Sequence, residues 1–172
     1  TALQYLNMGI GQKIQKNFDA ALCAYQIALQ IYRSALGKNH VQVAWSLNNI
    51  ANLYVEIGDY KVGLKFFHKT LQIYRQIFGE KHPNIAFVLD NLATTYYYND
   101  QFSTALYYYQ QALTNLYPNY NNAVYLHNPL LDQCSSTTVL LDVFTHKAQT
   151  LYRKSVQASN IIPVQLLASY TT

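Results

Sequence analysis

Apolar side chains recur at helical spacing along most of the chain. Leu47, Ile50, Ala51 and Tyr54 occupy positions i, i+3, i+4 and i+7, which share one face of an α-helix. Segment 64–74 repeats this spacing. The pattern predicts helices at 2–14, 18–36, 41–57, 60–78, 84–98, 102–116 and 136–157, a long connection at 117–135, and the start of another helix at 163–172.

Helix-breaking residues stand where these predicted helices end or begin. Gly58 suits the end of a helix, and Asp59 offers an N-cap oxygen to the next one. Gly37 and Gly79 follow the two long helices, and Pro83 suits a first helical turn, where its missing N–H costs nothing. Successive helices are therefore expected to form antiparallel hairpins.

The hairpins are copies of one unit. The segment Leu29–Arg33 returns as Leu71–Arg75, an offset of 42 residues that also relates Ala51 to Ala93. The offset predicts three and a half to four repeats, at 2–36, 41–78, 84–116 and 136–172. One hairpin cannot bury its apolar face alone, so the repeats should stack into a single all-α solenoid domain over residues 1–172. Because the last copy is truncated, we expect a fragment of a longer protein.

The repeat resembles the tetratricopeptide (TPR) family. Leu47, Ile50-Ala51 and Tyr54 resemble the pattern of its first helix, and Ala105, Tyr109 and Ala112 that of its second. The 42-residue unit, with the runs 47–51 and 79–83, is similar to the long kinesin-light-chain type of TPR. The resemblance implies a right-handed superhelix whose concave wall comes mostly from the first helix of each hairpin.

The tail carries a second, narrower resemblance. Segments 112–121, 128–129, 140–142 and 147–148 are similar to part of some bacterial proteins in which TPRs precede a caspase-like CHAT protease domain. This resemblance implies a protease domain beyond residue 172. It carries no catalytic residue into the chain.

Outward positions of the first helices form the candidate binding groove. These positions combine aromatic anchors, which are typical binding hot spots, with amide and carboxylate groups that can pair with a peptide backbone. The candidate groove residues are Trp45, Asn48, Asn52, Glu56, Phe87, Asp90, Thr94, Tyr97, Tyr98 and Gln149. Further outward positions are Leu3, Leu6, Ile10, Lys13, Val55, Asp142, Thr145, Tyr152 and Arg153.

Several of these positions also permit a purely structural interpretation. Trp45 and Phe87 are equally compatible with packing against a neighbouring helix, because aromatic residues often fill interiors. Asn49 and Asn91 follow the repeat, which favours hydrogen bonds between helices over contact with a ligand. Tyr96 and its neighbours cover almost a full turn, so we assign Tyr96 to packing and the next two to the surface.

Charge and composition exclude several classes of partner. The net charge is +4, but residues 1–81 carry +5, residues 82–146 carry −4 and residues 147–172 carry +3. Nucleic-acid binders usually cluster Lys and Arg in one stripe, so this dispersed pattern argues against nucleic acid. There is no apolar run of about 18 residues, so no membrane span is predicted. The two cysteines fit a reducing cytosol, and we expect a cytoplasmic protein.

The motifs of catalysis and metal binding are missing. His40 and His82 are equivalent positions one repeat apart and cannot share an ion, and His146 has no Cys or His at ligand spacing. No phosphate-binding loop, dinucleotide loop or nucleophile elbow occurs. We therefore predict no metal, no cofactor and no enzyme activity. A groove containing Glu56 and Asp90 remains only a formal enzyme alternative.

The predicted function is that of a scaffold that binds a peptide or protein segment in the groove. The alternative is a regulatory TPR region that packs on its own downstream CHAT-type domain. The two differ in whether the groove's occupant comes from another protein or from the same chain.

Overall fold

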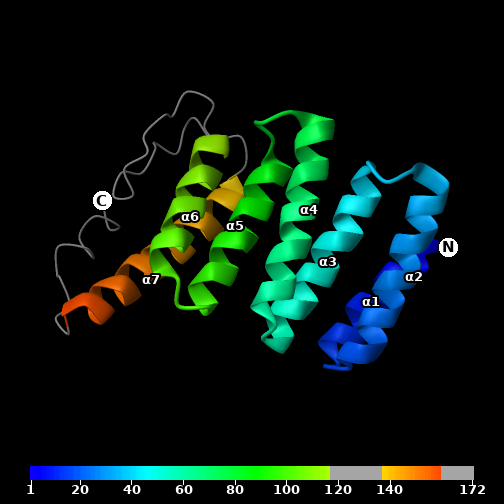
Figure 1. Ribbon diagram of the computed structural model, residues 1–172, viewed down its shortest axis with the longest axis horizontal. Helices are drawn as coiled ribbons and strands as arrows, with labels where there is room; N and C mark the ends of the chain where they lie inside the picture. Colours follow the sequence, from blue (N-terminus) through cyan, green and yellow to red (C-terminus); the bar gives the residue numbers. More distant parts are fainter. Residues whose placement is uncertain (117–136, 160–172) are drawn as a thin grey trace. The chain divides into compact units, whose positions relative to one another are not determined.

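The computed structural model describes residues 1–116 and 137–159, which form seven α-helices and no strand (Figure 1). The helices are α1 (Ala2–Ile14), α2 (Phe18–Leu36), α3 (Val41–Ile57), α4 (Tyr60–Phe78), α5 (Pro83–Tyr98), α6 (Phe102–Leu116) and α7 (Thr137–Ser159). Contacts divide the chain into two units, Thr1–Glu80 and Lys81–Thr172. The first unit holds α1 to α4, and the second holds α5 to α7.

The all-α repeat fold predicted from the sequence is confirmed. The predicted bounds agree for α1, α2, α3, α4 and α6, whereas α5 begins one residue earlier, at Pro83, and α7 spans Thr137–Ser159 instead of 136–157. The predicted connection at 117–135 and the predicted helix at 163–172 lie outside the described residues. The division into one domain of four repeats stays a prediction.

The first unit consists of two antiparallel hairpins, α1–α2 and α3–α4, and α2 also packs on α3. Its core contains Leu6, Tyr25, Leu47 and Phe67, all of which are buried. The burial of Leu6 corrects its predicted outward position. Thr70 on α4 donates a hydrogen bond to the carbonyl oxygen of Ala44 on α3, 3.4 Å away, and so joins the helices of the second hairpin.

Glycine permits close helix contact within each hairpin of the first unit. A Cβ atom at Gly9 of α1 would lie 2.5 Å from the ring of Tyr25 on α2. A Cβ atom at Gly63 of α4 would lie 2.8 Å from a methyl group of Val55 and 3.2 Å from the carbonyl oxygen of Ala51, both on α3. Side chains at these two positions would push the paired helices apart.

The predicted helix caps are present. Gly58 ends α3 in the left-handed conformation (φ 93°), where a residue with a Cβ is strained, and the side chain of Asp59 accepts a hydrogen bond from the Val62 N–H. Pro83 is the first residue of α5. His40 and His82 are also N-caps, because each Nδ1 accepts the backbone N–H two residues ahead. The repeat therefore retains these histidine positions as helix starts.

The second unit consists of the α5–α6 hairpin with α7 packed against both helices. Leu92, Leu106 and Tyr109 lie in its core, and α7 adds Val143 and Leu151. The ring of Tyr96 on α5 stacks on the ring of Tyr108 on α6, with centroids 5.3 Å apart. This contact agrees with the packing role predicted for Tyr96.

Candidate functional site

In the first unit, the candidate residues lie along one side of α3. Trp45 is 39% exposed, Asn52 is half-buried and Glu56 is exposed. Glu56 forms a 3.4 Å ion pair with Lys13, which connects this side of α3 to α1. Trp45, Asn52 and Glu56 are thus accessible positions on the first helix of their hairpin.

Asn48 does not share this exposure. Its side chain is only 3% exposed, so its predicted outward orientation is wrong. Asn48 follows Ala44 by four residues and precedes Ala51 by three, and both alanines are fully buried. These spacings place the three residues on one face of α3, so Asn48 belongs to the packed face.

The expected inter-helix role of Asn49 is also corrected. Its side-chain amide donates to the Trp45 carbonyl oxygen at 3.1 Å, within the same helix.

In the second unit, the candidate residues of α5 differ strongly in exposure. Phe87 is 43% exposed and Tyr98 is also exposed, whereas Thr94 and Tyr97 are half-buried. Asp90 is buried, at 6% exposed, which corrects its predicted role as a surface carboxylate. It repeats the Asn48 position, lying four residues after the buried Ala86 and three before the buried Ala93.

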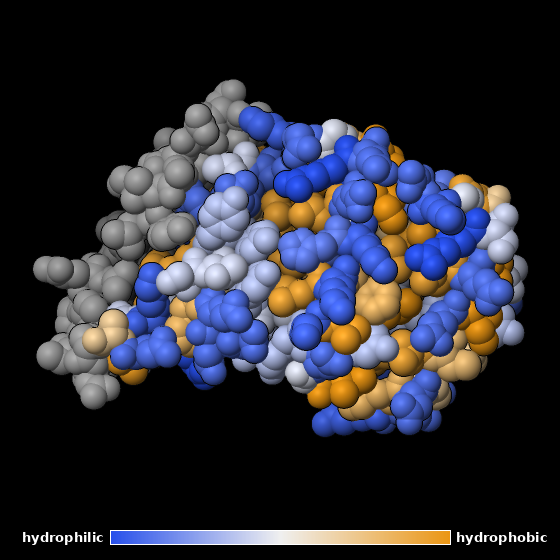
Figure 2. All heavy atoms as spheres, viewed as in Figure 1, coloured by the Kyte–Doolittle hydropathy of each residue, from blue (hydrophilic) through white to orange (hydrophobic). Residues whose placement is uncertain are grey.

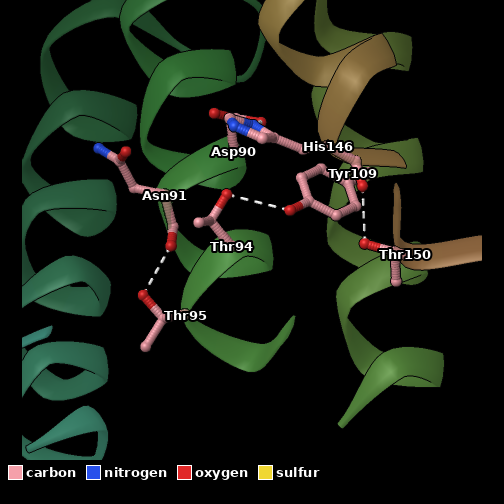
Figure 3. Close-up of polar contacts among 7 residues, drawn as sticks. All are labelled: Asp90, Asn91, Thr94, Thr95, Tyr109, His146 and Thr150. Carbon is pink, nitrogen blue, oxygen red and sulfur yellow. Dashed lines mark hydrogen bonds and ion pairs between the residues drawn. The ribbon is translucent and has the colours of Figure 1, made fainter. Parts of the chain in front are cut away.

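The partner of Asp90 comes from α7. Nδ1 of His146 lies 3.1 Å from Oδ1 of Asp90, and Figure 3 shows the two side chains pointing toward each other between α5 and α7. Burial raises the pKa of Asp90 above its usual value, and the hydrogen bond from His146 partly offsets this effect. The same hydrogen bond raises the pKa of His146. Each group thus favours the charged form of the other.

Further polar contacts lie near this pair. The hydroxyls of Thr94 and Tyr109 lie 3.0 Å apart, and Thr150 donates to the carbonyl oxygen of His146 at 2.7 Å (Figure 3). Burial raises the pKa of Tyr109 far above its usual value, so its hydroxyl stays protonated. These contacts connect α5, α6 and α7 through polar groups inside the second unit.

Two further cations of α7 serve its packing. Nζ of Lys147 is buried and donates to the side-chain oxygen of Gln110 at 3.0 Å. The guanidinium of Arg153 lies 5.4 Å from the ring centre of Tyr97, in cation–π contact. Gln149, the one candidate groove residue on α7, is exposed.

Sequence reasoning missed the roles of His146 and Lys147. His146 was considered only as a metal ligand, and the pairing of His146 with Asp90 spans 56 residues. The one sequence signal was that Asp90 lies in a stretch without Lys or Arg. That stretch, residues 82–146, contains His146, so a histidine was one candidate for a partner.

Clusters of metal ligands and membrane-spanning helices are both absent from the described part of the chain. In residues 1–116 and 137–159, no group of three or more His, Cys, Asp or Glu is arranged to hold a metal ion. Among the same residues, no helix has the length and apolar character needed to cross a membrane.

The accessible candidates repeat between the two units. Trp45 and Phe87 are related by the 42-residue offset, and so are Asn52 and Thr94. The same offset relates Glu56 to Tyr98. Each unit therefore presents an exposed aromatic ring on the first helix of a hairpin, which we call a first-type helix. A small hydrogen-bonding side chain follows it two turns later.

Repeated antiparallel helix hairpins with shared core positions define the class of α-helical repeat proteins. Comparison with family models gives the particular family, because the tetratricopeptide repeat model matches residues 1–62 and 56–117. The chain belongs to the tetratricopeptide repeat family, whose fold commonly serves protein–protein interaction. A comparison with curated protein sequences found no significant match.

Solved structures share this fold at low sequence identity. BtubC (BKLC) from P. vanneervenii is 18% identical, with a TM-score of 0.75 over 98% of this chain and 60% of BtubC. A putative kinesin light chain from Podosopora anserina, with nearly identical TPR-like repeats, is 15% identical, with a TM-score of 0.60 over 96% of this chain and 80% of that one.

The TPR2AB domain of yeast Sti1, solved as a complex with pHSP90, is also similar. It is 16% identical, with a TM-score of 0.63 over 91% of this chain and 50% of the Sti1 chain. The present chain thus spans 60% of BtubC and half of the Sti1 chain. At these identities the similarity shows the fold alone.

Proposed function

We propose that the chain is a protein-interaction module that binds an extended peptide or protein segment along the first-type helices of its repeats, in the concave groove typical of this family. The accessible candidates are Trp45, Asn52 and Glu56 in the first unit and Phe87, Thr94, Tyr97, Tyr98 and Gln149 in the second. Asn48 and Asp90 are left out because their side chains are buried.

The observation that carries this proposal is the repeated exposure of Trp45 and Phe87. A folded chain gains by burying such rings, yet both equivalent rings leave about two-fifths of their surface exposed. Aromatic rings of this kind lose little conformational entropy on binding and are enriched at binding hot spots. Their repetition predicts that each unit offers the same kind of aromatic anchor to a partner segment.

The neighbouring polar groups suit a peptide backbone. The Asn52 amide can both donate and accept, and the Thr94 hydroxyl can do the same. A segment in extended conformation has unpaired N–H and C=O groups at regular intervals, which these side chains would satisfy. The expected ligand is therefore recognised partly through its main chain and partly through one or two apolar side chains.

The test uses the single tryptophan of the chain as a reporter. A displayed library of random twelve-residue peptides is selected on the 172-residue chain, and each selected peptide is titrated while Trp45 fluorescence is followed. Peptides that bind along α3 should shift the emission to shorter wavelength, because they remove the indole from water. Selected peptides that leave the emission unchanged would contradict the assignment of α3.

Alanine variants then measure the contribution of each position. Phe87→Ala and Asn52→Ala should weaken binding of the selected peptides, the former by about 2 kcal/mol, which is roughly thirtyfold. Tyr107→Ala is the matched control, because Tyr107 is 49% exposed but lies on α6, a second-type helix. Equal losses in Phe87→Ala and Tyr107→Ala would count against the groove.

A regulatory role beside a downstream CHAT-type protease domain stays a prediction. Much of the segment with that resemblance lies in residues 117–136, outside the described part of the chain. If such a domain follows, the segment that occupies the groove could come from the same chain, and the same fluorescence assay with peptides of that domain would test it.

A further inference from the structure

The first unit has a groove on the side of α2 and α4, the second helices of its two hairpins (second-type helices). Two adjoining depressions, of about 460 and 190 Å³, lie between α2 and α4, and both are bordered by Arg33 of α2 and Lys69 of α4. Leu47 and Ile50 of α3 form part of their floor. We call this feature, with its cationic rim of Arg33, Lys38 and Lys69, the α2–α4 groove.

The groove combines an apolar floor with a polar rim. Figure 2 shows hydrophobic atoms in the strip between the hydrophilic side chains of α2 and α4. Four glutamines add amide groups to the rim: Gln26, Gln30, Gln72 and Gln76. Of the described residues that line the groove, none carries a carboxylate, so the lining has three positive charges and no negative one.

The cations of the rim are not neutralised within the described part of the chain. No ion pair there involves Arg33, Lys38 or Lys69. Two carboxylates of the first unit pair elsewhere: Glu56 with Lys13 and Glu80 with Arg75. The Lys69 ammonium lies 5.6 Å from the ring centre of Phe66, a contact that favours its position at the groove.

The internal repeat shows which partner the rim lacks. Arg75 repeats Arg33 after 42 residues, and its Nε lies 3.0 Å from a carboxylate oxygen of Glu80. A similar depression adjoins that pair. The residue equivalent to Glu80 in the first copy is Lys38, so Arg33 has a second cation where Arg75 has a carboxylate. A carboxylate from outside the repeat would restore the missing pair.

We propose that the α2–α4 groove binds an acidic peptide segment of a partner protein, with apolar side chains on the floor and carboxylates at Arg33, Lys38 and Lys69. The helical wall from Gln26 to Ser34 rises about 12 Å, which matches about four residues of extended chain. Such a segment needs carboxylates on either side of an apolar residue. The cationic rim of this site lies on α2, on α4 and at Lys38, and not on the first helices of the hairpins used by the function proposed above, so the site does not depend on that function.

The test is a fluorescence-anisotropy titration with a dye-labelled octapeptide of alternating glutamate and leucine. Binding should strengthen at low salt, because the contacts are charged and partly exposed. A peptide with lysine in place of glutamate should bind at least tenfold more weakly, and so should one with serine in place of leucine. Equal binding of the lysine peptide would overturn the proposal.

Matched variants locate the site. Arg33→Glu and Lys69→Glu should each weaken the glutamate–leucine peptide at least tenfold, and each should strengthen binding of the lysine–leucine peptide. Lys61→Glu is the control, since it makes the same charge change on α4, about 12 Å along the helix from Lys69. An equal loss in Lys61→Glu would show nonspecific charge attraction and refute the site.

A single-stranded oligonucleotide provides the competing outcome. Suppose that a twelve-nucleotide DNA binds and loses affinity in Lys69→Glu, while the acidic peptide does not bind. The groove would then be a nucleic-acid site, and the proposal would be wrong. Since Arg33, Lys61 and Lys69 are exposed, all variants should keep the wild-type circular dichroism spectrum.

Discussion

His146 of α7 and Asp90 of α5 form a hydrogen-bonded pair, with Nδ1 and Oδ1 3.1 Å apart. The carboxylate is buried, while about a third of the imidazole side chain is exposed. The pair connects α7 to the first helix of the preceding hairpin. Asp90 of α5 is thereby buried against α7 and not exposed to solvent.

This pair should make stability depend on pH. The pKa of His146 is raised in the folded state, so its contribution is complete below pH 6.5 and is lost as pH rises through the folded value. The pKa of Asp90 is also raised, so stability falls as pH rises just above 3.8. We expect the difference in unfolding free energy between wild type and His146→Gln to shrink by roughly 1 kcal/mol above pH 6.5, given solvent screening.

Urea denaturation at several pH values measures this difference. His68→Gln is the control, because burial lowers the pKa of His68 and its effect should run the other way, with stability rising as pH approaches 6.5. A wild-type and His146→Gln difference that is constant from pH 6 to 8 would contradict the assigned pair.

Lys147 should influence stability at alkaline pH. Its side chain is 0% exposed, and burial lowers its pKa from 10.5 to about 8. Between these values the unfolded chain binds more protons, so stability should rise with pH, by roughly 3 kcal/mol at most. Lys147→Met should remove this rise, and Lys154→Met on the same helix is the control. Parallel pH profiles for wild type and Lys147→Met would show that Lys147 is not buried.

Gly9 and Gly11 offer a matched pair on α1. A Cβ at Gly9 would lie 2.5 Å from the Tyr25 ring, whereas a Cβ at Gly11 would have no neighbour within 4 Å. Gly9→Ala should destabilise by about 1–3 kcal/mol through overpacking, and Gly11→Ala should stabilise by roughly 0.5–1 kcal/mol through helix propensity. Thermal melts of the two variants give the comparison, and equal melting temperatures would refute the close α1–α2 contact.

Leu71 tests the packing of α4. It is buried, so Leu71→Ala should lower the unfolding free energy by about 2–5 kcal/mol. Ile77→Ala, on the exposed side of the same helix, should have a much smaller effect. A Leu71→Ala protein as stable as Ile77→Ala would mean that the buried face of α4 has been assigned incorrectly.

The helices were largely predictable from the sequence because local signals define them. Gly58, Asp59 and Pro83 sit at ends that follow from backbone chemistry alone, and the 42-residue offset relates the bounds of α2 to those of α4. The boundaries of α7 were less certain, because its copy of the repeat is degenerate and lacks those breakers.

The candidate site was only partly predictable. Helical periodicity predicted the buried face of each helix but not how wide that face is. Because Asn48 and Asp90 are polar, they were expected to be exposed. The buried alanines on either side place both residues on the packed face instead. The contact between Asp90 and His146 depends on how α7 packs against α5. That packing joins residues 56 positions apart, which no local pattern encodes.

The contrast between Arg33 with Lys38 and Arg75 with Glu80 has a consequence for repeat proteins in general. Repeated hairpins share the residues that fold them, so a few solvent-facing residues can differ between copies while the architecture stays the same. Lys38→Glu would give Arg33 the carboxylate that Arg75 has in Glu80, and would remove the charge difference between the two copies. Each copy can therefore change its surface chemistry independently of the next.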